Sequence, residues 1–162
     1  MKRSGITLGV AAIALCGAGF ATGAPAGAPD VCQLLPAQLV ATEMDATLLA
    51  TRNFPDAQHG RARCVYQLAF PRTKGDDDGP QTAIVVWFQP ADEYDELAAE
   101  HEGPKDVVTG VGDAAFAFLD PGDKRHKIFA VKRGRGMIEV SAERPDHLQA
   151  LARLALEHLP AK

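Results

Sequence analysis

Cys32 and Cys64 are the two cysteines that follow the N-terminal leader of this 162-residue chain. In an exported protein, two such cysteines are most simply explained by one disulfide. That bond would close a loop of about 33 residues and would contribute roughly 3–4 kcal/mol to the free energy of unfolding. A redox or metal pair fits less well, because the two cysteines are far apart and form no C-x-x-C motif. The sequence therefore predicts a covalent link between an N-terminal segment and the middle of the chain.

The disulfide depends on export, and the start of the chain predicts export. Two basic residues are followed by an apolar run of eleven residues that ends at Cys16, and then by small residues. This is the layout of a secretory signal peptide, and the run is shorter than the roughly 20 apolar residues that a membrane-spanning helix needs. We therefore expect residues 1–23 to form the signal peptide, with cleavage between 21 and 26. The mature protein is expected in the periplasm or outside the cell.

Cys16 permits a second interpretation, in which it is the lipid-modified cysteine of a bacterial lipoprotein. Such a signal has a small residue directly before the cysteine, and here Leu15 stands in that place. We therefore do not expect a lipid anchor at Cys16. No later segment is long and apolar enough to span a bilayer, so no membrane span is expected either.

The charge balance argues against a nucleic-acid partner. The chain has 17 basic and 21 acidic residues, for a net charge of −4. Cleavage of the leader would remove Lys2 and Arg3 but no acidic residue. An acidic domain is poorly suited to bind a phosphate backbone. The length that remains suits one domain with its own core.

Hydrophobic periodicity predicts a single α+β domain over residues 31–160, after a flexible Pro/Gly/Ala lead-in at residues 24–30. Alternating and β-branched segments predict strands, and i, i+3, i+4 apolar spacing predicts helices. The expected order is helix, strands, helix, strands, helix, which is typical of helices packed on an antiparallel sheet. The expected helices lie at residues 31–35, 36–44, 90–104 and from 145 onward, and the expected strands at residues 61–70, 82–88, 113–120, 128–134 and 136–142.

The stretch "GVGDAAF", which begins at Gly110, resembles a phosphate-binding glycine loop at first sight. It lacks the third glycine of G-x-G-x-x-G and the lysine of a P-loop, and it runs into a strand pattern instead of a helix. The amide groups of a helix start are therefore not expected there. We expect Gly110 and Gly112 to supply backbone angles for a turn, and Asp113 to accept nearby amide hydrogens.

Other candidates for metal or catalytic chemistry are weak. "GDDDG" lacks the spacing of a calcium loop, the five histidines include no H-x-x-x-H pair and are expected to be exposed, and Ser141 has no nucleophile-elbow turn around it. Glu139 lies in an otherwise apolar strand, but its alternation places it on the polar face, where we expect it to be solvated. No catalytic residue, metal site or cofactor is therefore predicted.

The predicted contact surfaces are the exposed faces of the strands and two charged hairpin turns. Such loops commonly carry binding while a sheet holds them in place. The candidate contact residues in the turns are Lys74, Asp76, Asp77, Asp78, Asp123, Lys124, Arg125 and His126.

Five segments together resemble a group of small exported bacterial proteins of unknown function, some of whose actinobacterial members are lipoproteins. They are a cysteine followed by "QLLPAQLVA", a second cysteine in "ARCVYQL", "VTGVGDAAF", "FAVKRGRGMIEVSA" and a closing helix. The resemblance covers Val31 to Leu159 and implies a Cys32–Cys64 bridge and an envelope location. It supplies no catalytic residues.

These observations predict an exported, non-enzymatic protein that binds another protein or a small ligand in the bacterial envelope. Two alternatives stay open. One is an inhibitor or immunity-type protein that acts on a secreted enzyme. The other is a metal-dependent hydrolase whose site is assembled from residues distant in sequence.

Overall fold

The computed structural model describes residues 29–71, 81–101, 103–143 and 147–159. Its elements follow the chain in the order α1 (Val31–Leu34), α2 (Ala37–Glu43), β1 (Thr47–Asp56), β2 (Arg61–Ala69), β3 (Gln81–Pro90), α3 (Asp92–Glu100), β4 (Asp106–Val108), β5 (Ala114–Leu119), β6 (Lys127–Arg133), β7 (Gly136–Ala142) and α4 (Leu148–Glu157). The predicted α+β class is confirmed.

The strands form one seven-stranded sheet in the order β1-β2-β3-β7-β6-β5-β4, and each neighbouring pair is antiparallel. Consecutive strands pair within two meanders, β1 to β3 and β4 to β7. The meanders join where β3 pairs with β7. The predicted antiparallel sheet is therefore confirmed, and β3 lies inside it, as its apolar pattern on both faces predicted.

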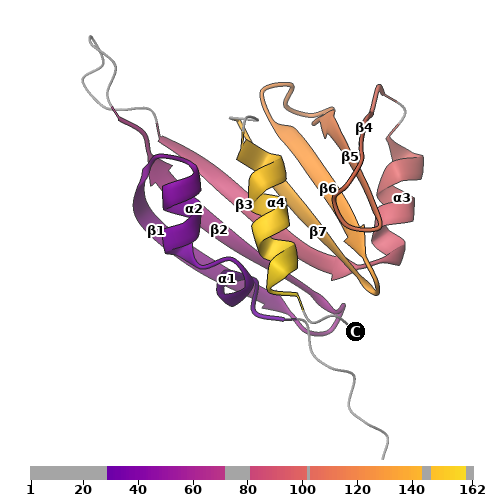
Figure 1. Cartoon of the computed structure of the whole chain (residues 1–162), viewed down its shortest axis with the longest axis horizontal. Helices are drawn as coiled ribbons and strands as arrows, with labels where there is room; N and C mark the ends of the chain where they lie inside the picture. Colours follow the sequence, from indigo (N-terminus) through magenta and orange to yellow (C-terminus); the bar gives the residue numbers. More distant parts are fainter. Residues whose placement is uncertain (1–28, 72–80, 102, 144–146, 160–162) are drawn as a thin grey trace, which may run out of the picture.

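The main core lies between one face of this sheet and the helices α1, α2 and α4 (Figure 1). Alternate residues of β2, including Cys64, Tyr66 and Leu68, are wholly buried there. The apolar stripe of α4 packs against the same face and includes Leu151 and Ala155, both without exposed surface. The apolar residues at helical spacing on α4 and those at every second position of the strands thus pack together in a single core.

A second, smaller cluster lies on the opposite face of β5, β6 and β7. Phe116 and Phe118 belong to it, whereas Ala115 and Ala117 of the same strand belong to the main core. The cover is α3, whose buried Tyr94 meets the ring of Phe116 edge-on at 4.9 Å between centroids. The half of the sheet formed by β5 to β7 is therefore packed on both faces.

The N-terminal segment is held to the sheet by two interactions at β2. Cys32 and Cys64 form a disulfide with 5.2 Å between their Cα atoms, and the Tyr66 hydroxyl donates to the carbonyl oxygen of Leu35 at 2.5 Å. The carboxylate of Asp30 accepts from the backbone N–H of Cys32 at 3.0 Å and caps α1. The predicted cysteine pairing and the predicted cap are both present.

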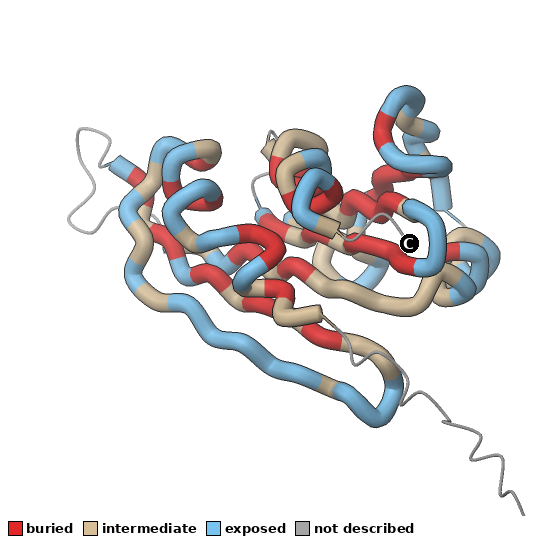
Figure 2. Tube along the Cα trace, turned by 60° about the horizontal axis from the view of Figure 1, so that its bottom comes forward, coloured by how far each residue is buried: buried red, intermediate tan, exposed pale blue. Residues whose placement is uncertain are grey.

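Two strands were not predicted. β1 is an edge strand that is exposed along most of its length (Figure 2), so its sequence does not alternate between buried and exposed residues. A register shift between Leu48 and Ala50 interrupts the pattern further, and Pro55 is tolerated because the strand lies at an edge. β4 has three residues, which is too short to show a period. Both strands depend on pairing with a neighbour.

The glycines of "GVGD" form a turn, as predicted. Gly110 and Gly112 have φ values of +74° and +59°, and Asp113 follows them into β5. The carboxylate of Asp113 accepts from the backbone N–H of Gly134 at 2.7 Å, and the N–H of Asp113 donates to Lys132 O at 2.8 Å. The turn before β5 is thereby fastened to the β6–β7 turn.

No helix in the described ranges has both the length and the apolar character that crossing a bilayer requires.

Candidate functional site

The half of the sheet formed by β1, β2 and β3 has a face that points away from α1, α2 and α4. We call it the open sheet face. Residues directly opposite each other in the strand register belong to the same face. The open sheet face comprises Arg52, Phe54, Arg61, Arg63, Val65, Gln67, Ala83, Val85 and Trp87.

The centre of the open sheet face is an arginine held between two aromatic rings. Arg63 is paired with Phe54 on β1 and with Trp87 on β3. Its guanidinium carbon lies 4.5 Å from the centroid of the Phe54 ring and 5.0 Å from that of Trp87. Both distances are within the range of cation–π attraction. Three strands thus bring together side chains that are far apart in the sequence.

The rings contact the guanidinium of Arg63 but do not satisfy its N–H groups. A guanidinium has five N–H donors in its plane. Within the described part of the chain, Arg63 has no hydrogen-bond acceptor or carboxylate partner, and the same holds for the exposed Arg52. The arrangement can therefore receive an external acceptor, and a carboxylate has a geometry that matches the donor fork of arginine.

Glu139 continues the same cross-strand row on β7. It lies opposite Trp87 on one side and opposite Ala130, a member of the α3-covered cluster, on the other. Burial raises the pKa of Glu139 to about 7, although Gln89 Nε2 donates to its carboxylate at 3.1 Å and favours ionisation. The expectation of a solvated Glu139 was wrong: the side chain is partly buried between β3 and β6, and Met137 on the same face belongs to the α3-covered cluster.

The raised pKa of Glu139 predicts that its contribution to the stability of the protein falls as the pH rises. The pKa of Glu139 is about 7 in the folded chain against an ordinary value of 4.5, so between these values the folded state binds more protons. The stabilisation is therefore complete below about pH 4.5 and is lost as the pH rises through about 7. Glu139→Gln keeps the shape and removes the titration. Its stability relative to the parent protein should increase by on the order of 2–3 kcal/mol between pH 4.5 and pH 8.

Urea denaturation of both proteins across this pH range measures the difference. Parallel stability curves for the variant and the parent protein would show that Glu139 is solvated after all.

Positive charge on the open sheet face contrasts with the acidic chain around it. Arg61 forms an ion pair and hydrogen bonds with Glu93 at the start of α3, so its charge is compensated. Asp56, at the end of β1, binds His59 through its Oδ1 and Oδ2 at 2.9 Å. Among the residues that the structure describes, Arg52 and Arg63 have no carboxylate partner, although the chain as a whole has a net charge of −4.

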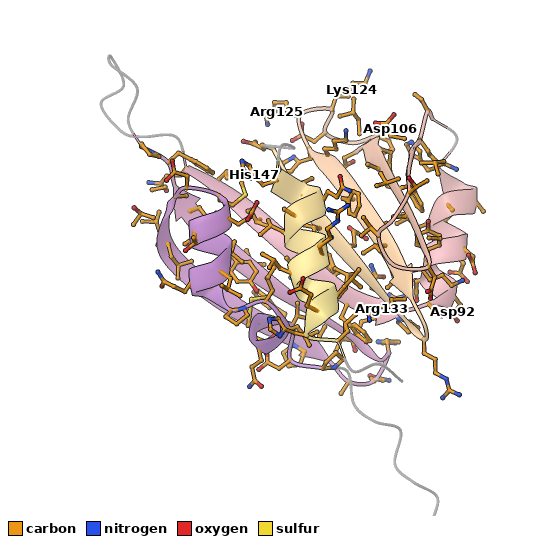
Figure 3. All side chains as sticks on the ribbon, in the orientation of Figure 1. Asp92, Asp106, Lys124, Arg125, Arg133 and His147 are labelled. Atoms are coloured by element: carbon orange, nitrogen blue, oxygen red, sulfur yellow. A yellow bond between two sulfur atoms is a disulfide. The ribbon has the colours of Figure 1, made fainter. Side chains whose placement is uncertain are left out.

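Of the two predicted contact turns, only the one at Asp123 to His126 lies within the described residues, and it is not part of the open sheet face. Lys74, Asp76, Asp77 and Asp78 fall outside the described residues. The other four residues form the β5–β6 turn, and Lys124 and Arg125 extend from it beyond the end of the sheet (Figure 3).

Asp123 and Arg125 bind each other within that turn, and the Arg125 guanidinium holds the pKa of Asp123 at about 2. The ring of His126 contacts the same carboxylate at 3.0 Å.

Asp123, His126 and Glu143 have one potential ligand atom each within 4.8 Å of one another, which is the arrangement that a cation would need. Arg125 lies 3.2 Å from the Asp123 carboxylate and 3.8 Å from that of Glu143. A positive charge is therefore already supplied by the protein. We interpret the group as an ion-pair cluster that orders the turn.

A hollow of about 540 Å³ lies between the end of α3 and the β5–β6 turn, and Lys124 is one of its lining residues. His101 also lines it, with its ring 4.1 Å from that of Phe118 and its Nε2 buried without a hydrogen-bond partner in the described residues. The expectation that all five histidines are exposed holds for His59 and His158 and was wrong for His101, His126 and His147, which are partly buried. The acidic Glu100 and Asp120 flank the lysine, so the lining has no single charge preference.

Sequence reasoning predicted contact surfaces on exposed strand faces but missed which residues would meet there. Phe54 lies in β1, which was not predicted. Nothing in the sequence next to Arg63 or Trp87 indicated that their side chains would meet. The one available signal was composition, since Trp87 is the single tryptophan of the chain and aromatic residues with arginine are enriched at binding surfaces.

Comparison with known proteins identifies no family for this chain. No protein-family model matches the chain, and no curated protein matches it. A solved structure, a GTP binding regulator from Thermotoga maritima, is similar with a TM-score of 0.43 and 13% sequence identity, over 80% of this chain and 88% of that one. A likeness this distant carries no inference about a ligand or an activity.

Proposed function

We propose that this chain is an exported, non-enzymatic binding protein of the bacterial cell envelope and that the open sheet face is its contact surface. The observation that carries the proposal is the Arg63 guanidinium between Phe54 and Trp87, with no acceptor for its N–H groups in the described residues. Trp and Arg are the residue types that most often dominate binding energy at protein interfaces.

Export is supported by the signal-peptide layout of residues 1–23 and by the Cys32–Cys64 disulfide. Disulfides persist in oxidising compartments and are rare in the cytosol. The resemblance to small exported bacterial proteins agrees with this location. Cell fractionation should recover a chain that has lost its leader from the periplasm or the medium, and uncut chain in the cytosol would contradict the proposal.

Site-specific photo-crosslinking tests the contact surface. A photoreactive amino acid at Gln67, an exposed position on the open sheet face, should give crosslinked adducts in envelope preparations from the bacterium that makes the protein. The matched control is the same amino acid at Arg153, an exposed position on α4. Equal adducts from both positions, or none from Gln67, would exclude the open sheet face. Identification of the adduct separates a secreted enzyme, expected for an inhibitor or immunity-type protein, from another envelope partner.

A further inference from the structure

The chemistry of the open sheet face also indicates what kind of partner it fits, an inference that rests on the proposed function. We propose that the face docks an acidic, extended segment of a partner protein, whose carboxylates bind the guanidinium groups of Arg63 and Arg52. The aromatic rings of Phe54 and Trp87 provide the apolar contact on either side of the arginine.

Charge complementarity supports an acidic partner. Each basic group of the open sheet face except Arg52 and Arg63 has its own carboxylate, since Arg61 binds Glu93. The acidic groups beside the face are engaged too, because Asp56 binds His59 and Glu139 accepts from Gln89. On this face of the described structure, the two charges without a partner are therefore positive, and a carboxylate would pair with them.

The fixed position of Arg63 supports a specific contact over loose attraction. Its side chain is held between the rings of Phe54 and Trp87 before any partner arrives. Less side-chain entropy is then lost when a carboxylate binds, which is the benefit of a preorganised site.

The shape of the face favours a protein segment over a small ligand. Small-molecule sites are concave, and two hollows of about 540 and 480 Å³ lie beside α3 and the β4–β5 turn, with no residue of β1, β2 or β3 in their linings. Two uncompensated arginines are also too few for a lipid surface, which is usually bound by clusters of four to eight basic residues. An extended segment can instead lie across neighbouring strands and reach both arginines.

Trp87 provides a direct readout, because it is the single tryptophan of the chain and contacts Arg63. The disulfide-bonded protein would be titrated with an acetylated and amidated decapeptide of alternating Glu and Thr. The matched peptide carries Gln in place of Glu. We expect a saturable change in Trp87 emission with the Glu peptide and binding of the Gln peptide that is weaker by about tenfold or more.

Two variants and one control locate the contact. Arg63→Gln and Arg52→Gln should each weaken binding of the Glu peptide by about tenfold, whereas Arg153→Gln on α4 should leave it unchanged. Arg52 is exposed and its guanidinium forms no cation–π pair in the described residues, so its variant tests the proposal even if Arg63→Gln disturbs the strands.

Several results would overturn the proposal. These are equal binding of the two peptides, an equal effect of Arg153→Gln, or the same emission change on concentrating the protein alone, which would identify a second copy as the occupant. If neither peptide binds but crosslinking at Gln67 gives adducts, the open sheet face is a contact surface and the proposal of an acidic segment as its partner is wrong. If both experiments fail, the proposed function falls as well.

Discussion

The double substitution Cys32→Ala and Cys64→Ala should lower the free energy of unfolding by about 3–4 kcal/mol. The disulfide closes a loop with a sequence separation of 32 residues, and the entropy that this removes from the unfolded chain gives the magnitude. A typical domain has a total stability of about 5–15 kcal/mol, so the loss is a large share. Because Cys64 is wholly buried against the main core, alanine is preferred to serine, whose hydroxyl would need a partner.

Urea denaturation with and without reductant provides the measurement and its control. The parent protein should lose about the same stability when its disulfide is reduced, and the double variant should not respond to reductant. Equal stability of the oxidised parent protein and the variant would show that α1 stays on the sheet without the covalent link.

Gly112→Ala should destabilise the protein by about 3 kcal/mol or more. The backbone at Gly112 has a φ of +59°, which costs an L-residue roughly 1–2 kcal/mol. A Cβ atom there would also lie 2.5 Å from Lys132 O and 2.6 Å from Val131 Cγ2, and overpacking of this kind costs about 1–3 kcal/mol. Since Lys132 O is a backbone atom in the sheet, it cannot move aside without disturbing β6.

Gly110→Ala is the matched control for this effect. Gly110 also has a positive φ, at +74°, but a Cβ atom there would meet nothing within 4 Å. The Gly110→Ala variant should therefore lose only the stability that a positive φ costs an L-residue, about 1 kcal/mol. Thermal or urea denaturation of the two variants measures the difference, and equal losses would show that the close approach to β6 is relieved by a small backbone shift.

Much of the fold could be predicted because the signals for it are local. In β2, the alternation of the larger Cys64, Tyr66 and Leu68 with Val65, Gln67 and Ala69 predicted one buried face, and Cys64, Tyr66 and Leu68 are wholly buried. The i, i+3, i+4 spacing in α4 identified its buried stripe in the same way. β1 gave no such signal because an exposed edge strand needs no apolar period, and its place in the sheet comes from pairing with β2.

The candidate site depended on long-range register to a much greater degree. Phe54, Arg63 and Trp87 belong to three strands, and only their pairing places the guanidinium between the two rings. Glu139 shows the same limit. Its alternation grouped it with Met137 and Ser141, but the neighbouring β3 and β6 decided that its side chain is partly buried and that its pKa is raised.

The amino-acid sequence alone determined the α+β class, the cysteine pairing and the turn at Gly110 and Gly112, because periodicity, cysteine number and glycine geometry are properties of short segments. The tertiary structure decided which face of the sheet stays open and which charges on it lack a partner. Those properties arise where strands distant in sequence meet, and a pattern along one segment does not contain them.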